Sequence, residues 1–238
     1  MLSQMDLVRY WDCSGEKVAY RRLDNLLTGC TDNAALPVDT PGMRNRRHLF
    51  LHRQLIGSEM EAQAQCPQCK TQCEFQLPIS AMLDSPAPEP GQLLEVVHAG
   101  KTYRFRLPTM GDIDALDPQT EPGQIGRLLA EACLEDKACQ LPDEVITRLK
   151  QLLDKADPLA TPVFDVICSE CSHAFLASVN LASYVAREFD LLVNRLLRDV
   201  HVLARAYGWS EAEILAIPRS RRARYLSMIS QSTHPAAV

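Results

Sequence analysis

Two stretches of the chain share one pattern and decide its fold: CPQCKTQCEFQLPISAML at 66–83 and CSECSHAFLASVNLASYV at 168–185. They align without gaps at an offset of 102 residues, from Cys66 to Cys168. Each begins with a CxxC pair, alternates like a strand, and then reaches a helix-start residue, Pro78 or Asn180. The segment YRFRLPTMGDIDAL at 103–116 repeats the strand-then-helix half without cysteines. An ancient duplication and two knuckles that solve the same local problem are both compatible with this repeat.

The two CxxC pairs predict one structural zinc site, formed by Cys66, Cys69, Cys168 and Cys171. A CxxC turn places two thiolates on one side of a tight turn, and two such turns complete a tetrahedron with Zn–S distances of about 2.3 Å. Four thiolates fill the coordination shell, so this metal is not expected to catalyse. Unliganded thiols and a redox or zinc-released thiol switch are the alternatives. A redox CxxC motif expects a helix that starts inside the motif, whereas a strand follows each pair here.

Two of the remaining five cysteines, Cys73 and Cys133, favour packing roles. The chain has nine cysteines, an odd number, and a disulfide framework is therefore not expected. Cys133 lies on the apolar face of a predicted helix and is expected in the core. Cys73 and His173 lie near the CxxC pairs and could substitute as ligands, but their strand positions favour core or edge roles.

A long insert separates the two pairs. Ninety-eight residues lie between Cys69 and Cys168, against roughly 15–20 in a compact zinc ribbon. The insert is predicted to contain a Pro-rich linker over 84–91, a β-hairpin built from 93–98 and 103–107, helices over 122–134 and 142–155, and a strand over 164–167. Zinc would then join two halves of the protein.

Helices are predicted at both ends of the chain. Near the N-terminus they cover about 16–28 and a segment from Thr40-Pro41 to just before Gly57. Near the C-terminus Asn180 caps a helix over 181–207, in which apolar residues recur at steps of three and four. After it follow a short helix with a capping box, Ser210 to Glu213, and a final basic helix beyond Pro218.

Residues 196–229 are predicted to form a partner-docking module. Trp209 is expected to pack in the corner between helices, and four arginines are expected outside it: Arg219, Arg221, Arg222 and Arg224. An exposed arginine cluster in an acidic protein suits the carboxylates of a protein partner, through bidentate pairs. A solvated helix face and a nucleic-acid contact are the alternatives.

Composition narrows the class of protein. The chain has 238 residues and a formal net charge of −5. A net negative charge disfavours general binding to nucleic acids, whose backbones are also negative. No apolar run approaches the roughly 20 residues of a membrane span, and the first residues lack the pattern of a secretory signal. We therefore expect a soluble intracellular protein. The chain contains no P-loop, GxSxG, HExxH or GxGxxG motif, and we expect no enzymatic activity.

These elements predict an α+β fold that is mainly helical. It has a small β platform of zinc-ribbon-like knuckles plus a β-hairpin, and a long C-terminal helix followed by two short helices. Three regions are predicted: an N-terminal helical region over 1–59, a β/zinc-knuckle region over 60–180, and a C-terminal helical module over 181–238, joined by zinc into one cooperative unit.

The C-terminal run LLRDVHVLARAYGWSEAEILAIPRSRRARYLSMI resembles the signature of T-even-type phage baseplate proteins, which also occur in phage-tail-like injection systems. Earlier segments resemble that family in the same order: RRHLFLHRQLIGSEMEAQAQCPQC, YRFRLPTMGDIDAL, and ADPLATPVFDVICSECSHAFLASVNLASYVAREFD. The resemblance covers about residues 40–230. Two departures are Ser172-His173, where a glycine-histidine pair is expected, and Tyr184-Val185, where a Leu-Trp pair is common.

The resemblance implies a structural or assembly protein of the baseplate or hub of a contractile tail. Its partners would be other baseplate, hub or tail proteins, with no nucleic acid, membrane or small-molecule substrate. It would be located in the bacterial cytoplasm during assembly; a component that stays in the tail particle and a factor that leaves it are both compatible with the sequence. A zinc-ribbon nucleic-acid-binding regulator and a thiol- or zinc-switch chaperone are the alternative functions.

Overall fold

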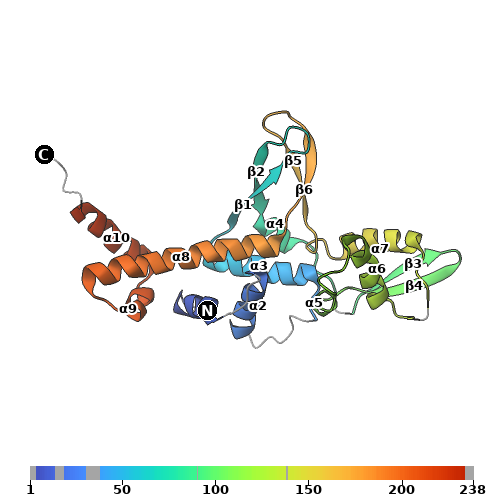
Figure 1. The fold of residues 1–238 in the computed structure, drawn as a ribbon, viewed down its shortest axis with the longest axis horizontal. Helices are drawn as coiled ribbons and strands as arrows, with labels where there is room; N and C mark the ends of the chain where they lie inside the picture. Colours follow the sequence, from blue (N-terminus) through green and yellow to red (C-terminus); the bar gives the residue numbers. More distant parts are fainter. Residues whose placement is uncertain (1–3, 14–18, 31–37, 90, 138, 234–238) are drawn as a thin grey trace. The chain divides into compact units, whose positions relative to one another are not determined.

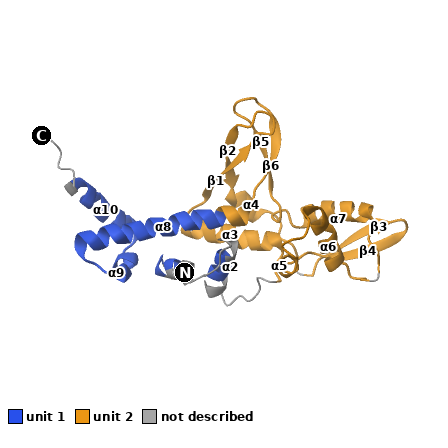
Figure 2. Cartoon of the chain, viewed as in Figure 1, with its two compact units in different colours: residues 1–32, 185–238 blue, residues 33–184 orange. Residues whose placement is uncertain are grey.

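The computed structural model describes residues 4–13, 19–30, 38–89, 91–137 and 139–233 (Figure 1). It confirms the α+β class: helices predominate, and the strands of the described part form small antiparallel hairpins. The chain divides into two compact units, residues 33–184 and residues 1–32 together with 185–238 (Figure 2). This division differs from the three sequence regions, because residues 1–32 group with the C-terminal helices and not with residues 33–59.

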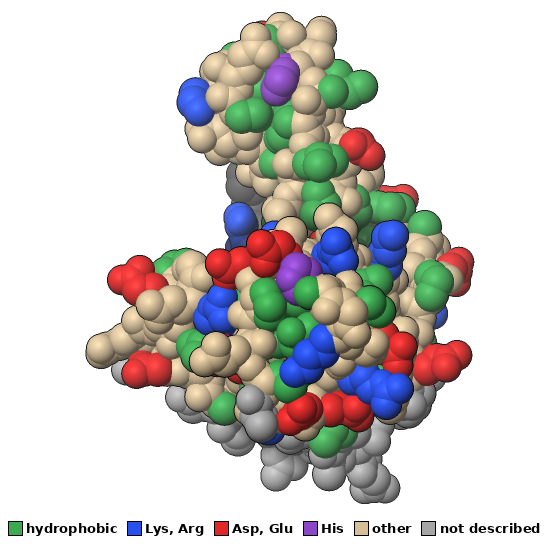
Figure 3. Space-filling view, turned by 90° about the vertical axis from the view of Figure 1, so that its right-hand side faces the viewer, with side chains coloured by type: hydrophobic (Ala, Val, Ile, Leu, Met, Phe, Trp, Pro, Cys, Tyr) green, Lys and Arg blue, Asp and Glu red, His purple; other side chains and the backbone are tan. Residues whose placement is uncertain are grey.

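Within the unit formed by residues 33–184, two hairpins carry the CxxC turns. Strand β1 (Glu59–Gln65) pairs with β2 (Gln72–Pro78), and β5 (Val163–Ile167) pairs with β6 (Ala174–Ser178). Their registers are equivalent at the 102-residue offset, since Gln65 opposes Gln72 and Ile167 opposes Ala174. The repeat found in the sequence is therefore a repeat of structure. The two hairpins form the projection at the top of Figures 1 and 3.

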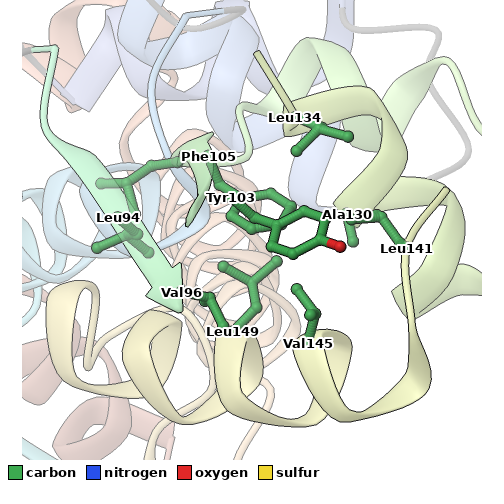
Figure 4. Close-up of a cluster of buried hydrophobic side chains, with 10 residues drawn as sticks. Leu94, Val96, Tyr103, Phe105, Ala130, Leu134, Leu141, Val145 and Leu149 are labelled. Carbon is green, nitrogen blue, oxygen red and sulfur yellow. The ribbon is translucent and has the colours of Figure 1, made fainter. Parts of the chain in front are cut away.

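A third hairpin and two helices build a separate hydrophobic core in the same unit. Strand β3 (Leu93–His98) pairs with β4 (Lys101–Arg106) around a turn in which Ala99 and Gly100 have positive φ, as a two-residue type I′ turn requires. Helices α6 (Pro122–Cys133) and α7 (Asp143–Ala156) pack against this hairpin. Figure 4 shows Tyr103 and Phe105 of β4 among aliphatic side chains of β3, α6 and α7. Cys133, at the end of α6, is buried as expected.

Helix α3 (Pro41–Leu55) begins where the sequence predicts. Thr40 caps it by accepting a hydrogen bond from the Met43 amide at 3.2 Å, and Pro41 occupies the first helical position. A second amide of the first helical turn, that of Gly42, donates a hydrogen bond to the buried carboxylate of Asp157 at 2.9 Å. This close approach requires glycine, because a Cβ at position 42 would lie 1.7 Å from Asp157 Oδ1.

Two short helices complete this unit. Helix α4 (Ile79–Asp84) follows β2 and packs on α3. Helix α5 (Met110–Asp114) follows β4 and has a capping box between Thr109 and Asp112. Arg106 donates two hydrogen bonds to the Asp112 carboxylate, at 2.6 and 2.7 Å. This pair ties the end of the β3–β4 hairpin to the first turn of α5.

The other unit is helical throughout its described residues. It contains α1 (Gln4–Cys13), α2 (Ala19–Cys30), most of α8 (Leu181–Tyr207), α9 (Glu211–Ala216) and α10 (Arg219–Thr233). Helix α1 packs on α2 and α9, and Arg22 of α2 forms an ion pair with Asp190 of α8 at 2.9 Å. The predicted helix over 16–28 corresponds to α2, and its first part, up to residue 18, lies outside the described residues.

The bounds of α8 match the prediction because both ends carry local signals. Asn180 Oδ1 accepts a hydrogen bond from the Ser183 amide at 3.0 Å, and Gly208 stops the helix with a φ of 70°. Ser210 and Glu213 then form the expected capping box. At this corner the rings of Tyr207 and Trp209 stack with centroids 4.6 Å apart, and the ring of Tyr225 meets both edge-on, at 5.8 Å from Tyr207 and 5.1 Å from Trp209.

Candidate metal centre

The two CxxC turns have the same backbone geometry. The Cys66 amide donates to the Thr71 carbonyl at 2.9 Å, and the Lys70 amide donates to the Cys66 carbonyl at 3.0 Å. The second turn repeats both bonds at the 102-residue offset, at 3.0 Å from Cys168 to His173 and at 2.9 Å from Ser172 to Cys168. Each turn thus holds its two thiols on one side.

The residue after each second cysteine adopts the left-handed conformation. The φ angle is 65° at Lys70 and 57° at Ser172. This region favours glycine, because any Cβ there approaches the following carbonyl oxygen. Ser172 is one of the two departures from the baseplate-protein pattern, and its φ explains why a glycine suits that position.

The turns bring four sulfur atoms into one cluster. Cys66 Sγ lies 3.7 Å from Cys171 Sγ, and Cys69 Sγ lies 3.4 Å from Cys168 Sγ. All four sulfurs lie within 4.8 Å of one another. A zinc tetrahedron with Zn–S bonds of about 2.3 Å separates its sulfurs by about 3.8 Å. The cluster therefore fits a tetrahedral ion, with one pair of thiols from each hairpin.

The pKa values of two neighbouring thiols of the cluster, Cys69 and Cys171, are shifted in opposite directions. Hydrogen bonds from the Thr71 side chain and backbone lower the pKa of Cys69 to about 6, although burial opposes them. At Cys171 a hydrogen bond from the His173 backbone favours the thiolate, but burial and three neighbouring thiols outweigh it and raise the pKa to about 12. The four sulfurs cannot all ionise at neutral pH without a cation, so a bound metal would displace protons.

The cluster lies at the end of a small hydrophobic core shared by the two hairpins. Cys66 and Cys168 are buried, Cys171 is half-buried, and Cys69 is exposed. Behind them, Phe75 of β2 lies 5.9 Å from Phe164 of β5 between ring centroids. This core is small, so a metal that ties the two turns together would be a main source of its stability.

The two candidate substitute ligands have other roles. Among the described residues, the group that could hold a metal consists of the four CxxC cysteines alone. Cys73 is buried in the core between the hairpins. His173 stacks on Phe175, with ring centroids 6.4 Å apart and planes 7° apart. The structure therefore agrees with the core or edge roles expected for both residues.

The donor set defines what the centre can do chemically. Four thiolates saturate a zinc ion, whereas a catalytic zinc keeps one position for water or substrate and uses histidine or carboxylate ligands. The site fits a structural ion with four cysteine ligands that fastens β1–β2 to β5–β6. Both knuckles belong to the unit formed by residues 33–184, so the ion would act within that unit.

The predicted docking residues lie in the other unit, and one of them is not exposed. Arg219, Arg221 and Arg224 are exposed on α10, and Trp209 is half-buried in the aromatic corner. The expectation that Arg222 lies outside is wrong, because its side chain is only 2% exposed. Arg222 Nε donates to Asp199 Oδ2 at 2.9 Å, and its Nη1 donates to Gln4 Oε1 at 2.5 Å.

A periodic signal in the sequence could have identified Arg222. Together with Tyr225, Leu226 and Ile229 it has the spacing i, i+3, i+4, i+7, which is one face of a helix. The face is half-buried at its three apolar positions and buried at the arginine. Arg222 thus anchors α10 to α8 and α1 and is not a docking residue.

Comparisons with known proteins add no further assignment. The chain matches no protein-family model, no curated protein and no solved structure. In the described part of the chain, no helix combines the length and apolar character needed to cross a bilayer.

Proposed function

We propose that the chain is a structural or assembly protein of the baseplate or hub of a contractile tail, in a phage or a phage-like injection system, and that a zinc ion held by four cysteines stabilises it. The observation that carries this proposal is the closed cluster of four thiols shared by two hairpins. Such a cluster supports a scaffold and leaves no position for catalysis. The order of sequence segments that resemble baseplate proteins supports the tail in particular.

The C-terminal helices supply the proposed contact with a tail protein. Arg221 and Arg224 are exposed and lie about 60° apart around α10, since successive residues turn by about 100°. Arg219 lies about 160° from Arg221 and faces elsewhere. Tyr225 lies about 40° around the helix from Arg221, and its ring contacts the rings of Trp209 and Tyr207. Arginine beside tyrosine and tryptophan is the composition typical of interface hot spots.

The net charge of the chain supports a protein partner over a nucleic acid. On the face seen in Figure 3, Lys and Arg side chains alternate with Asp and Glu and form no continuous basic surface. The chain as a whole carries a net charge of −5. Phosphate backbones are bound by clustered basic residues in domains with an excess of positive charge, and this chain as a whole has an excess of negative charge.

Charge reversal on α10 tests the proposal. We expect Arg221→Glu/Arg224→Glu to block formation of normal tail particles, scored by electron microscopy, while the isolated protein stays folded and metal-loaded. Arg219→Glu, on another face of the same helix, is the matched control and should assemble. Normal particles from the double variant would contradict the docking role, and salt-sensitive DNA binding lost in that variant would favour the nucleic-acid regulator instead.

A further inference from the structure

Lys101 and Cys139 bring an amine and a thiol into direct contact, away from the four cysteines of the metal centre. The Lys101 Nζ lies 2.7 Å from the Cys139 Sγ. This distance is short for a contact to sulfur, because N–H···O bonds to the smaller oxygen atom are usually about 2.9–3.0 Å long. The Cys139 thiol also donates a hydrogen bond to Asp136 Oδ2 at 2.9 Å. The sulfur therefore lies between an amine and a carboxylate that can accept its proton.

Neighbouring contacts fix the backbone on both sides of this pair. Lys101 is the first residue of β4, and its Nζ lies 5.2 Å from the centroid of the Tyr103 ring. The segment between α6 and α7 is held on the same strand, because the Glu135 amide donates to the Arg104 carbonyl at 3.0 Å. Cys139, in that segment, packs against the hydrophobic core of the hairpin. Two reacting groups held together in this way react with each other far more readily than they would in free solution.

Other cysteines and lysines of the same region provide internal comparisons. Cys133 is buried, and its Sγ is contacted by the Arg106 guanidinium at 3.7 Å. Lys137 donates to two backbone carbonyls, at 2.8 and 2.6 Å. Among the cysteines that the structure describes, Cys139 alone has a lysine nitrogen within hydrogen-bond distance. It is half-buried and its lysine partner is exposed, so an oxidant dissolved in water can reach the pair.

The separation of the nitrogen and the sulfur indicates which covalent product the pair can form. An S–S bond is about 2.05 Å long, and a bond from sulfur to the smaller nitrogen atom is shorter still. The observed 2.7 Å is therefore too long for a direct bond, whereas a single oxygen atom bonded to both atoms spans it. We propose that Lys101 and Cys139 are an oxidative modification site, at which dioxygen forms a reversible Nζ–O–Sγ bridge between the two side chains.

The reaction balances with one molecule of dioxygen. One oxygen atom bonds to both Sγ and Nζ, and the O–O bond, the S–H bond and one N–H bond break. The second oxygen atom leaves as water with the two released hydrogen atoms. Sulfur and nitrogen each lose two electrons, and dioxygen gains all four. Four equivalents of a small thiol reverse the reaction: they restore the amine and the thiol, release water and leave two disulfides of the reductant.

The bridge fastens the segment between α6 and α7 to the first residue of β4. It closes the loop from 101 to 139, and a crosslink of this kind stabilises a fold mainly by restricting the unfolded chain. The bridged protein should therefore unfold at a higher temperature than the reduced protein. This inference goes beyond the proposed function, because it assigns a redox-dependent modification to a hairpin that takes part in neither the metal centre nor the docking helix.

Mass spectrometry of the full chain tests the proposal. The protein is purified with dithiothreitol, freed of it, and exposed to air-saturated buffer. We expect a mass gain of about 14 Da, one oxygen atom less two hydrogen atoms, located on a crosslinked peptide that contains Lys101 and Cys139. Trypsin should no longer cleave after Lys101. Lys101→Gln, Lys101→Arg and Cys139→Ser should each abolish the gain, whereas the matched controls Lys137→Gln and Cys133→Ser should keep it.

Dithiothreitol should remove the added mass and restore cleavage after Lys101. This reversal distinguishes the bridge from methylation of the lysine, which adds nearly the same mass. Four results would overturn the proposal: no gain in mass, a gain of about 16 or 32 Da on Cys139 alone, a loss of about 2 Da that indicates a direct bond, or a gain of about 14 Da that survives in Lys101→Gln. None of these results depends on metal content or on tail assembly, so the proposed function is tested separately.

Discussion

Replacing Arg222 with alanine is expected to destabilise the unit formed by residues 1–32 and 185–238. The lost guanidinium is 2% exposed and binds Asp199 at 2.9 Å and Gln4 at 2.5 Å. Removing one partner of a buried ion pair costs about 3–5 kcal/mol, because the other charge stays buried. The Asp199 side chain is 20% exposed and keeps some contact with water, so we expect the lower end of this range. At about 4–8 °C per kcal/mol for a unit of this size, a loss of about 3 kcal/mol should lower the midpoint of thermal unfolding by about 12–24 °C.

Urea denaturation followed by tryptophan fluorescence measures the stability of the unit that contains Arg222. Both tryptophans of the chain, Trp11 and Trp209, belong to residues 1–32 and 185–238. Arg224→Ala is the matched control on the same helix, and its exposed side chain should change the free energy of unfolding by at most about 0.5 kcal/mol. A double-mutant cycle with Asp199→Ala should give a coupling energy of about 1–3 kcal/mol.

Two results would refute the anchoring role of Arg222. One is a loss of stability in Arg222→Ala no larger than that of Arg224→Ala. The other is strict additivity of Arg222→Ala and Asp199→Ala, which would mean that the two side chains do not interact. Arg222→Met separates the charge from packing, because it keeps an apolar stem of similar length.

Two further substitutions test the other unit. Gly42→Ala should lower the free energy of unfolding by about 1–3 kcal/mol in urea denaturation followed by circular dichroism, because a Cβ 1.7 Å from Asp157 Oδ1 displaces the buried carboxylate from its amide donor. Gly126→Ala, in α6 with open space around it, should instead raise the free energy of unfolding by about 0.5–1 kcal/mol. Equal effects of the two substitutions would contradict the close approach of Asp157 to Gly42. The Arg106 guanidinium holds the pKa of the Asp112 carboxyl well below its usual range. The ionised Asp112 therefore stabilises the folded chain fully above pH about 4, the ordinary carboxyl pKa, and this stabilisation is lost as the pH falls from there through the lowered pKa. Asp112→Asn should therefore cost about 1 kcal/mol at pH 7 and progressively less in acid, and a cost that grows in acid would contradict this account.

Local signals explain what the sequence predicted correctly. The limits of α8 follow from Asn180, Gly208 and a regular apolar period, and the β3–β4 hairpin follows from alternation around Ala99-Gly100. The four metal-binding candidates could be chosen because CxxC spacing is itself a short-range property. In each case the information lies within a few residues of the feature.

Features that depend on tertiary contacts were harder to predict from the sequence. Strand β1 was not predicted as a strand, because its inner face offers only Met60, Ala62 and Ala64 as alternating apolar residues. The grouping of residues 1–32 with the C-terminal helices depends on contacts such as Arg22 with Asp190, which have no trace in either local sequence. The burial of Arg222 was marked by its helical spacing, but three exposed arginines beside it obscured the signal.

The metal content of the purified chain tests the central claim, a structural ion shared by the two hairpins, most directly. Native mass spectrometry with elemental analysis should find one zinc per chain, lost together with solubility in Cys66→Ser, because a structural zinc ion contributes on the order of 10 kcal/mol to folding at neutral pH. Cys133→Ser, remote from the cluster, should keep its zinc. Stoichiometric zinc retained after both Cys168 and Cys171 are replaced by serine would contradict the account.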